Sequence, residues 1–372
     1  MKIGIDARLI QGGFCGDRTY WRGLIGGIAR INAVHHDEYL LYTFSKLPPP
    51  NPSETGGFAV RQLNALTGRD WCLWSFPRML GKDGVQVAHV QYSMPPYAPC
   101  PIITSVHDVS FRRCPQFFSF KDRFLLDLGM RIGAHRAAKI LVLSNFTRSE
   151  MIELYRVPPE KIEVVYPGVE EQFQPLDKAC SKKVIQERYS ISQPFIITVG
   201  VVPARKNIHS LIRAFGILKG ILPIKHKLVI LGNHRGQDRQ LLRLADSIGI
   251  SGDVVLTGVV TNEDLPHFYN AADLSVYPSV YEGFGLPALE AMACGVPVIT
   301  SNLSALPEVI GDAGLAVDPT PEALADAMAE VLSNMSLRSE LSARGLKRAK
   351  AFNWDSTARR VVEIYREVAS NN

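Results

Sequence analysis

The sequence predicts an α/β protein of two domains, each with a parallel β-sheet enclosed by helices. Short apolar runs rich in β-branched residues alternate with longer helical segments along most of the chain. The alternation pauses in the polar stretch 172–181 and begins again at Pro194. A chain of 372 residues is long enough to build a separate core in each half. We therefore expect two Rossmann-like domains, residues 1–172 and residues 173–354.

The composition excludes several classes of protein. No run of about 18 apolar residues is present, so no membrane span is expected. The start, Met1–Asp6, is predicted to be a strand and lacks the features of a signal peptide, which indicates a cytoplasmic protein. The six cysteines form no CxxC pair, so we expect reduced thiols without a disulfide or metal framework. The net charge of +5 is mild, and no basic–aromatic array predicts a nucleic-acid partner.

The first domain begins with a buried strand and a glycine-rich turn. Gly13 and Gly16 lie in this turn, ahead of a helix expected from about Asp17 to Ile31. Such turns receive phosphates in open α/β sheets, although many need only the tight geometry. The strands of this domain are expected at Lys2–Ala7, Tyr39–Phe44, Ala59–Leu63, Val85–Val90, Ile102–Val106, Ile140–Leu143 and Ile162–Tyr166.

His107 is the candidate catalytic residue of the first domain. It follows the strand Ile102–Val106 directly, and parallel sheets bind ligands at the carboxyl ends of their strands. Asp108 comes next, and a histidine at a strand end followed by an acid is favoured as a site residue over a structural one. His89 and Gln91 end the preceding strand and are expected to line an acceptor site.

Two more helices are expected in this domain, Trp71–Leu80 and Lys121–Ala138. The second carries several cations, including Arg123 and Arg131. A solvated basic face is the favoured interpretation. The alternative is a peripheral surface that contacts anionic lipid head groups at the inner face of the membrane.

In the second domain, Arg205 and Lys206 precede a helix expected at Asn207–Leu218. Two cations at the start of a helix oppose its dipole, a cost that a bound anion would offset. An arginine fork beside a lysine charge suits a pyrophosphate. Gly200 ends the strand before them. The strands are expected at Pro194–Val199, Lys227–Leu231, Asp253–Leu256, Leu274–Tyr277 and Val296–Thr300.

A loop that runs into a helix, residues 282–290, is the most informative stretch. Its glycines free the backbone, and the N–H groups of Phe284, Gly285 and Leu286 are expected at a helix N-terminus, where anions bind. Glu282 lies just before this helix, and Glu290 is expected in its first turn. The alternative is that both acids only stabilise the positive end of the helix dipole.

Glu282 and Glu290, separated by seven residues that include Gly-Phe-Gly-Leu-Pro, resemble the signature of the retaining nucleotide-sugar glycosyltransferases of family four. Arg205-Lys206 and His107-Asp108 also resemble motifs of that family. The resemblance implies the GT-B fold, with the two domains facing across a cleft and the C-terminal helix, residues 355–372, crossing back to the N-terminal domain. One departure is Arg18, which stands where the family usually has a second glycine.

The same resemblance implies roles for the candidate residues. Glu282 and His107 would face the transferred sugar, and Glu290 would hold the ribose. Arg205 and Lys206 would grip the diphosphate. The backbone near Gly258 and Val259 would contact the nucleobase.

The expected partners are a nucleotide diphosphate sugar, with GDP-mannose as the first choice, and a glycan or lipid-linked acceptor. The N-terminal domain would bind the acceptor and the C-terminal domain the donor, in the synthesis of a bacterial polysaccharide. The sequence has no Asp-x-Asp pair placed to hold a metal on the diphosphate, so we expect a metal-independent reaction without a cofactor. A nucleotide-sugar hydrolase or epimerase of the same fold, and a non-catalytic binder, remain the alternatives.

Overall fold

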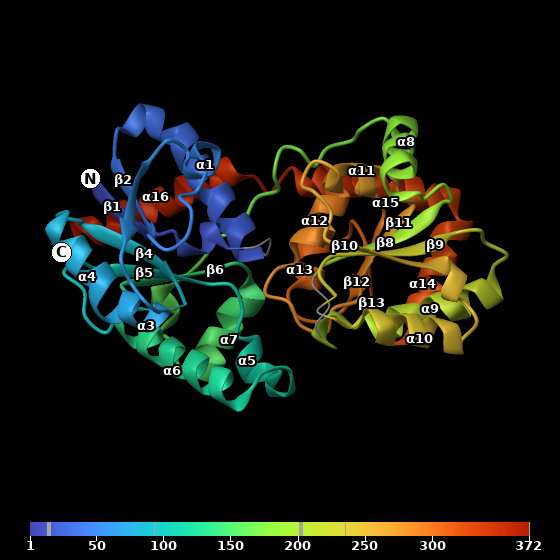
Figure 1. Ribbon diagram of the computed structural model, residues 1–372, viewed down its shortest axis with the longest axis horizontal. Coiled ribbons are helices and arrows are strands. Elements are labelled where there is room, and N and C mark those ends of the chain that lie inside the picture. Colours follow the sequence, from blue (N-terminus) through green and yellow to red (C-terminus); the bar gives the residue numbers. More distant parts are fainter. Residues whose placement is uncertain (13–15, 93, 201–203, 235, 372) are drawn as a thin grey trace. The chain divides into compact units, whose positions relative to one another are not determined.

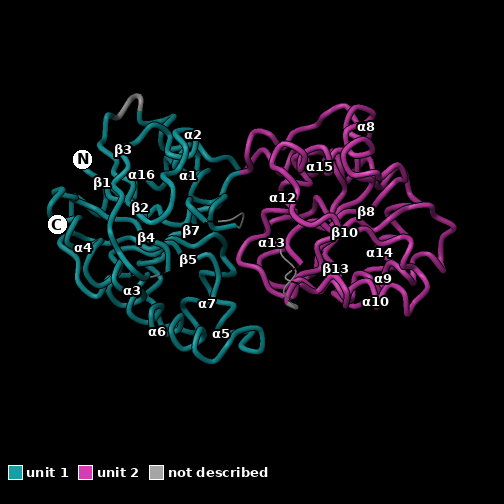
Figure 2. Tube along the Cα trace, in the orientation of Figure 1, with its two compact units in different colours: residues 1–168, 352–372 teal, residues 169–351 magenta. Residues whose placement is uncertain are grey.

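The computed structural model describes residues 1–12, 16–92, 94–200, 204–234 and 236–371. The chain divides into two compact units, residues 1–168 with 352–372 and residues 169–351 (Figure 2). Each unit contains one sheet, seven-stranded in the first and six-stranded in the second. All the strand pairs run parallel, which confirms the predicted α/β fold class. The division falls at 168/169, where the sequence predicted 172/173.

The sheet of the first unit has the strand order β3-β2-β1-β4-β5-β6-β7. Its strands are β1 (Lys2–Asp6), β2 (Glu38–Phe44), β3 (Ala59–Leu63), β4 (Val87–Gln91), β5 (Ile102–Val106), β6 (Lys139–Val142) and β7 (Ile162–Val164). Its helices are α1 (Gly16–His35), α2 (Pro52–Thr55), α3 (Gly68–Asp70), α4 (Phe76–Lys82), α5 (Ser110–Arg113), α6 (Phe120–Arg136), α7 (Asn145–Tyr155) and α16 (Trp354–Ser370). Figure 1 shows α1 towards the top of this unit and α6 below the labelled strands, and α16 packs along α1. The central strands β4 and β5 are therefore buried along their whole length.

The helix predicted at Trp71–Leu80 is interrupted. A π-helical turn, Trp71–Ser75, separates α3 from α4. It allows Trp71 and Phe76 to stack in the core, with their ring centroids 5.6 Å apart. The apolar periodicity of the sequence does not reveal this π-helical turn, because the turn adds a residue without changing the apolar character of the segment.

The C-terminal helix α16 packs along α1 through a glycine surface. A Cβ on Gly23 would lie 2.0 Å from the indole of Trp354, and one on Gly27 would lie 2.5 Å from its carbonyl oxygen. Only glycine at these two positions permits so close an approach. The C-terminal helix therefore returns to the first unit, as the family resemblance implied.

The sheet of the second unit has the strand order β10-β9-β8-β11-β12-β13. Its strands are β8 (Phe195–Val199), β9 (Lys227–Leu231), β10 (Val254–Gly258), β11 (Leu274–Tyr277), β12 (Val298–Ser301) and β13 (Leu315–Val317). Its helices are α8 (Lys178–Tyr189), α9 (Ile208–Ile221), α10 (Asp238–Ser247), α11 (Leu265–Ala271), α12 (Leu286–Ala293), α13 (Leu306–Ile310), α14 (Pro321–Ser333) and α15 (Met335–Ala349). The apolar sides of α9 and α14 pack on the central strands and form the main core.

Candidate active site

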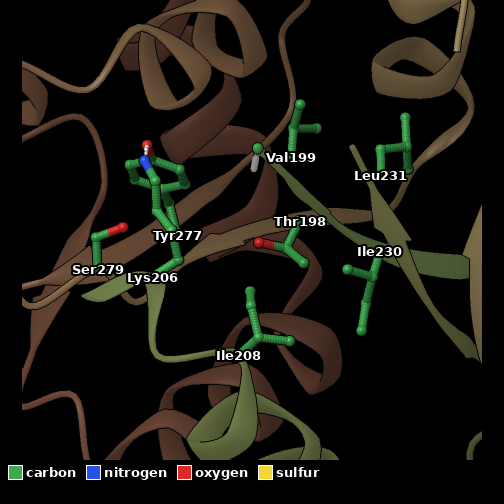
Figure 3. A pocket seen from close by; sticks show the side chains of 9 residues that line it. Thr198, Val199, Lys206, Ile208, Ile230, Leu231, Tyr277 and Ser279 are labelled. Carbon is green, nitrogen blue, oxygen red and sulfur yellow. Dashed lines mark hydrogen bonds between the residues drawn. The ribbon is translucent and has the colours of Figure 1, made fainter. Parts of the chain in front are cut away.

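A pocket opens at the carboxyl ends of β8, β9 and β11 in the second unit (Figure 3). Parallel sheets bind ligands at this edge. Figure 3 shows the ammonium of Lys206 at the hydroxyl of Tyr277. The pocket is lined by Thr198, Val199, Gly200, Lys206, Ile208, Ile230, Leu231, Tyr277 and Ser279.

Bare backbone surrounds this edge of the sheet, because three neighbouring strands end in glycine. Gly200, Gly232 and Gly258 all have positive φ, at 146°, 122° and 71°. A Cβ on Gly232 would lie 2.1 Å from the carbonyl oxygen of Gly200, so no side chain fits between the strand ends. Beyond Gly258, the side chain of Val259 is 59% exposed. A ligand can therefore approach the main chain closely here.

Glu282 is the centre of a buried ion-pair cluster beside this pocket. Its Oε1 lies 2.5 Å from Nζ of Lys206 and 3.1 Å from a guanidinium nitrogen of Arg205. Its backbone N–H donates to Oγ of Ser304 at 2.9 Å. Lys206 also donates to the hydroxyl of Tyr277. The neighbouring residues Arg205 and Lys206 thus contact Glu282, which lies 76 residues beyond Lys206 in the sequence.

Burial tends to raise the pKa of Glu282, but the charges of Lys206 and Arg205 outweigh it and lower that pKa to about 2. The carboxylate is therefore ionised at every physiological pH. Burial, with Glu282 as the next cause, raises the pKa of Tyr277 well above its usual value, so its hydroxyl stays protonated. The cluster carries two positive charges and one negative charge.

The two cations do not lie within the helix that follows them. Arg205 and Lys206 form a 3₁₀ turn, and α9 begins only at Ile208, after Asn207. Glu282 already supplies the anion that their position at a helix start led us to expect. The sequence interpretation of a cation pair awaiting an anion is therefore incomplete, because it missed this internal partner.

Helix α12 begins where the signature predicted, and its N-cap is Gly285, with φ 118°. A Cβ there would lie 2.5 Å from Leu306, which explains the glycine. The N–H groups of Ala288 and Leu289 bond the carbonyl oxygen of Gly285 at 3.1 and 3.4 Å, and Pro287 has no N–H, so a ligand at this helix start would meet the N–H groups that precede them. Phe284 is buried.

Glu290 does not lie in the first turn of α12, as the sequence led us to expect. It is the fifth residue of the helix, which starts at Leu286. Its Oε2 accepts a hydrogen bond from the hydroxyl of Tyr269 at 2.9 Å. Burial raises the pKa of Glu290 to about 7, and the nearby charge of Glu170 adds to this. A dipole interaction therefore does not explain this acid.

Each of the two carboxylate clusters contains a buried tyrosine. The hydroxyl of Tyr269 donates to Glu290, and the hydroxyl of Tyr277 accepts from Lys206. Sequence reasoning missed both tyrosines. Tyr277 was detectable as the last residue of a predicted strand, whereas Tyr269 lies within a helix and gave no signal.

The first unit brings His107 to the carboxyl end of β5, as the strand pattern predicted. Its Nδ1 lies 2.8 Å from Oδ1 of Asp17, which belongs to the first turn of α1. Oδ1 of Asp108 accepts hydrogen bonds from the N–H and Oγ of Ser110 at 2.9 and 2.7 Å. The acid that contacts the ring of His107 is therefore Asp17, which the sequence did not single out.

The other candidates of this unit differ in outcome. Gly16 is the first residue of α1, and Gly13 lies outside the described residues. Arg18 forms an ion pair with Glu54 at 2.7 Å. His89 is fully buried between Tyr365 and Ser105, so it does not line a site as expected. Burial, with His107 as a minor cause, lowers the pKa of His89 to about 3, which keeps it neutral.

Comparison with known proteins identifies the family. Residues 182–348 match the family described as glycosyl transferases group 1, and residues 36–173 match Glycosyltransferase Family 4. O-antigen chain mannosyltransferase B of Escherichia coli is 36% identical over 266 residues, which are 71% of this chain and 70% of that protein. The chain belongs to glycosyltransferase family 4.

Two further similarities concern this glycosyltransferase. A serotype-specific mannosyltransferase of Escherichia coli is 33% identical over 234 residues, which are 61% of the chain but only 28% of that larger protein. The structure of sucrose-phosphate synthase from Thermosynechococcus elongatus superposes with a TM-score of 0.80, covering 100% of both chains at 20% identity. At that identity the superposition supports the fold alone.

Proposed function

We propose that this glycosyltransferase moves mannose from GDP-mannose to a glycan or lipid-linked acceptor, with retention at the anomeric carbon. The reaction would serve the synthesis of a bacterial O-antigen polysaccharide in the cytoplasm. The contact of Glu282 with Lys206 and Arg205 carries the proposal, since it joins an acid suited to a sugar with two cations suited to a diphosphate. The similarity to mannosyltransferases supports the choice of sugar.

The charge of the cluster indicates how the donor would bind. Glu282 neutralises one of the two cations, so a diphosphate competes with it for Lys206 and Arg205. We propose that the diphosphate takes over these cations, together with the N–H groups that begin α12. The freed carboxylate of Glu282 then accepts hydrogen bonds from the sugar hydroxyls. Bare backbone at Gly200 and around Gly258 admits the nucleotide.

Transfer would proceed on one face of the sugar. The bond between the anomeric carbon and the diphosphate oxygen breaks, and a bond to the acceptor oxygen forms on the same face. The acceptor's proton passes to the departing diphosphate. Lys206 and Arg205 stabilise the charge of the leaving group, and Glu282 stabilises the positive charge on the sugar ring. The second unit is proposed to bind the donor and the first unit the acceptor.

The test is a transfer assay with a lipid-linked glycan acceptor and a panel of GDP- and UDP-linked sugars. We expect a mannosylated product from GDP-mannose, with the anomeric configuration of the donor. In a parallel melting assay, GDP at a hundred times its dissociation constant should add about 2.7 kcal/mol of stability. Free mannose as the product would indicate a hydrolase. A changed sugar on the nucleotide would indicate an epimerase, and GDP binding without turnover would indicate a non-catalytic binder.

We also propose that transfer needs no metal ion, because Lys206 and Arg205 supply the charge on the diphosphate. In the part of the chain that the structure describes, no group of three His, Cys, Asp or Glu side chains is placed to hold a metal. Activity is expected to be unchanged in excess EDTA. A loss of activity in EDTA that Mg²⁺ restores would contradict this proposal.

Glu290 is proposed to hold the ribose hydroxyls, which makes donor binding depend on pH. With a pKa of about 7, its carboxyl group is mostly protonated at pH 6 and mostly ionised at pH 8. Only the ionised form offers all its oxygen lone pairs to two hydroxyls. GDP affinity is therefore expected to rise about tenfold between these pH values, as the ionised fraction does. Calorimetric titration with GDP should show that the affinity of Glu290→Gln changes less with pH than the affinity of the wild type. A wild-type pH dependence in that variant would contradict the role of Glu290 in binding the ribose.

Helix α6 carries apolar side chains on its outer face as well as on its inner face. Phe120, Phe124, Leu125 and Leu128 are 82, 58, 39 and 45% exposed, at a spacing that places them on one side. Lys121 is exposed beside them. Apolar side chains beside a cation match an anionic bilayer surface. We propose that α6 docks on such a surface; no helix among the described residues is long and apolar enough to span it.

Vesicle co-sedimentation tests this docking. The protein should sediment with phosphatidylglycerol vesicles and less with phosphatidylcholine vesicles. The double variant Phe120→Ser, Phe124→Ser should stay in solution. Met335→Ser is the matched control, because Met335 is 73% exposed but lies in the second unit. Equal sedimentation of the double variant and the wild type would exclude α6 as the docking surface.

A further inference from the structure

Asp17 holds His107 within a partly buried hydrogen-bond network in the first unit. Oδ1 of Asp17 lies 2.8 Å from Nδ1 of His107 and 2.7 Å from Nε2 of Gln91. Oε1 of Gln91 accepts from Nε1 of Trp21 at 2.7 Å. The network joins the start of α1 to the ends of β4 and β5.

The donors and acceptors of this network fix the position of the proton on His107. The indole N–H of Trp21 can only donate, so the oxygen of Gln91 faces it and the amide nitrogen faces Asp17. Nδ1 of His107 lies 2.8 Å from Oδ1 of Asp17 and 3.2 Å from Nε2 of Gln91, which itself donates to Asp17 at 2.7 Å. An ionised carboxylate can only accept, so the shorter contact assigns a hydrogen to Nδ1 of His107. A neutral ring then has its lone pair on Nε2. This nitrogen is buried, and among the described residues it has no hydrogen-bond partner.

The surroundings also hold the ring in place. The ring of Tyr20 meets His107 edge-on at a centroid distance of 4.5 Å, and that of Tyr92 lies at 5.9 Å. Asp17 is in the first turn of α1, where the helix dipole favours a negative charge. A buried nitrogen with a fixed lone pair and no protein partner has the arrangement of a ligand contact.

We propose that Asp17 is a positioning residue, which locks His107 in the Nδ1–H tautomer so that Nε2 accepts a hydrogen bond from a substrate hydroxyl. Gln91 and Trp21 hold Asp17 in turn. This inference rests on the proposed function, because the hydroxyl would belong to the transferred sugar or to the acceptor.

Nitrogen NMR of the ¹⁵N-labelled histidines tests the tautomer without any assay of activity. The signals of His107 are assigned by their loss in His107→Gln. The wild type should show a pyrrole-type Nδ1 and a pyridine-type Nε2. Asp17→Asn should shift the ring towards the other tautomer, Asp17→Glu should preserve the wild-type pattern, and Asp108→Asn should leave it unchanged. A pyrrole-type Nε2 in the wild type would overturn the proposal.

Kinetics test whether Asp17 acts through His107. Asp17→Asn is expected to lower kcat about 10- to 100-fold, the usual effect of losing a partner that orients a reactive ring, with KM for the donor unchanged. In the His107→Gln background the same change should cost nothing further. Asp17→Glu should recover most of the rate. If Asp17→Asn lowered kcat by the same factor in the wild type and in His107→Gln, Asp17 would act independently of His107.

Two outcomes remain distinct. If the wild type transfers no sugar from any donor while the NMR pattern is as expected, the proposed function fails and the orienting network stands. If transfer occurs but Asp17→Asn keeps both the wild-type tautomer and the wild-type rate, the network has no positioning role and the proposed function stands.

Discussion

Lys206→Met is expected to lower kcat about 10²- to 10³-fold, equivalent to ~3 kcal/mol of transition-state stabilisation. Lys206 contacts Glu282 at 2.5 Å inside the pocket, so its charge acts where water does not screen it. Methionine keeps most of the volume and removes only the charge. Initial rates at saturating GDP-mannose measure the effect.

The control for this variant is Lys183→Met, because Lys183 has a side chain that is 75% exposed and belongs to the same unit. Its rate should equal that of the wild type. Circular dichroism should show both variants folded, since Arg205 still pairs with Glu282 in Lys206→Met. A rate within threefold of the wild type for Lys206→Met would exclude this lysine from leaving-group stabilisation.

Glu282→Gln is expected to separate nucleotide binding from transfer. The amide no longer competes for Lys206 and Arg205, so GDP should bind at least as tightly as in the wild type. The sugar loses its carboxylate partner, so kcat should fall about 10²-fold or more. Calorimetry with GDP and initial rates with GDP-mannose measure the two effects separately.

Glu187→Gln is the matched control for this second variant, because Glu187 is 62% exposed and only pairs with Lys183. It should change neither GDP affinity nor rate. If Glu282→Gln bound GDP much more weakly than the wild type, the carboxylate would support the cations instead of competing with the diphosphate. Wild-type turnover by this variant would remove Glu282 from the chemistry.

Much of the fold was predictable because local patterns decide it. Strands β1, β5 and β9 are short apolar runs, and buried parallel strands need such runs on both faces. The position of His107 at a strand end followed from the same pattern. The start of α12 was predicted within one residue by glycine and proline, whose backbone preferences depend little on distant parts of the chain.

The partners of the polar groups were not predictable in this way. Asp17 and His107 are 90 residues apart, and they meet because β1 lies next to β4, and β4 next to β5, in the sheet. Asp108, the neighbour of His107 in the sequence, instead accepts a hydrogen bond from Ser110. Likewise, the sequence did not show that Glu282 is the counter-ion of Lys206.

The sequence by itself determined the kind of most elements, the strand ends that carry polar residues, and the family to which the chain is similar. These follow from apolar periodicity, backbone preferences and short motifs, all of which act over a few residues. Only the tertiary structure decided that Glu282 stays ionised while the pKa of Glu290 reaches about 7. Burial raises the pKa of both acids, and the difference arises because Lys206 and Arg205 outweigh this effect at Glu282, whereas the hydrogen bond from Tyr269 does not offset it at Glu290.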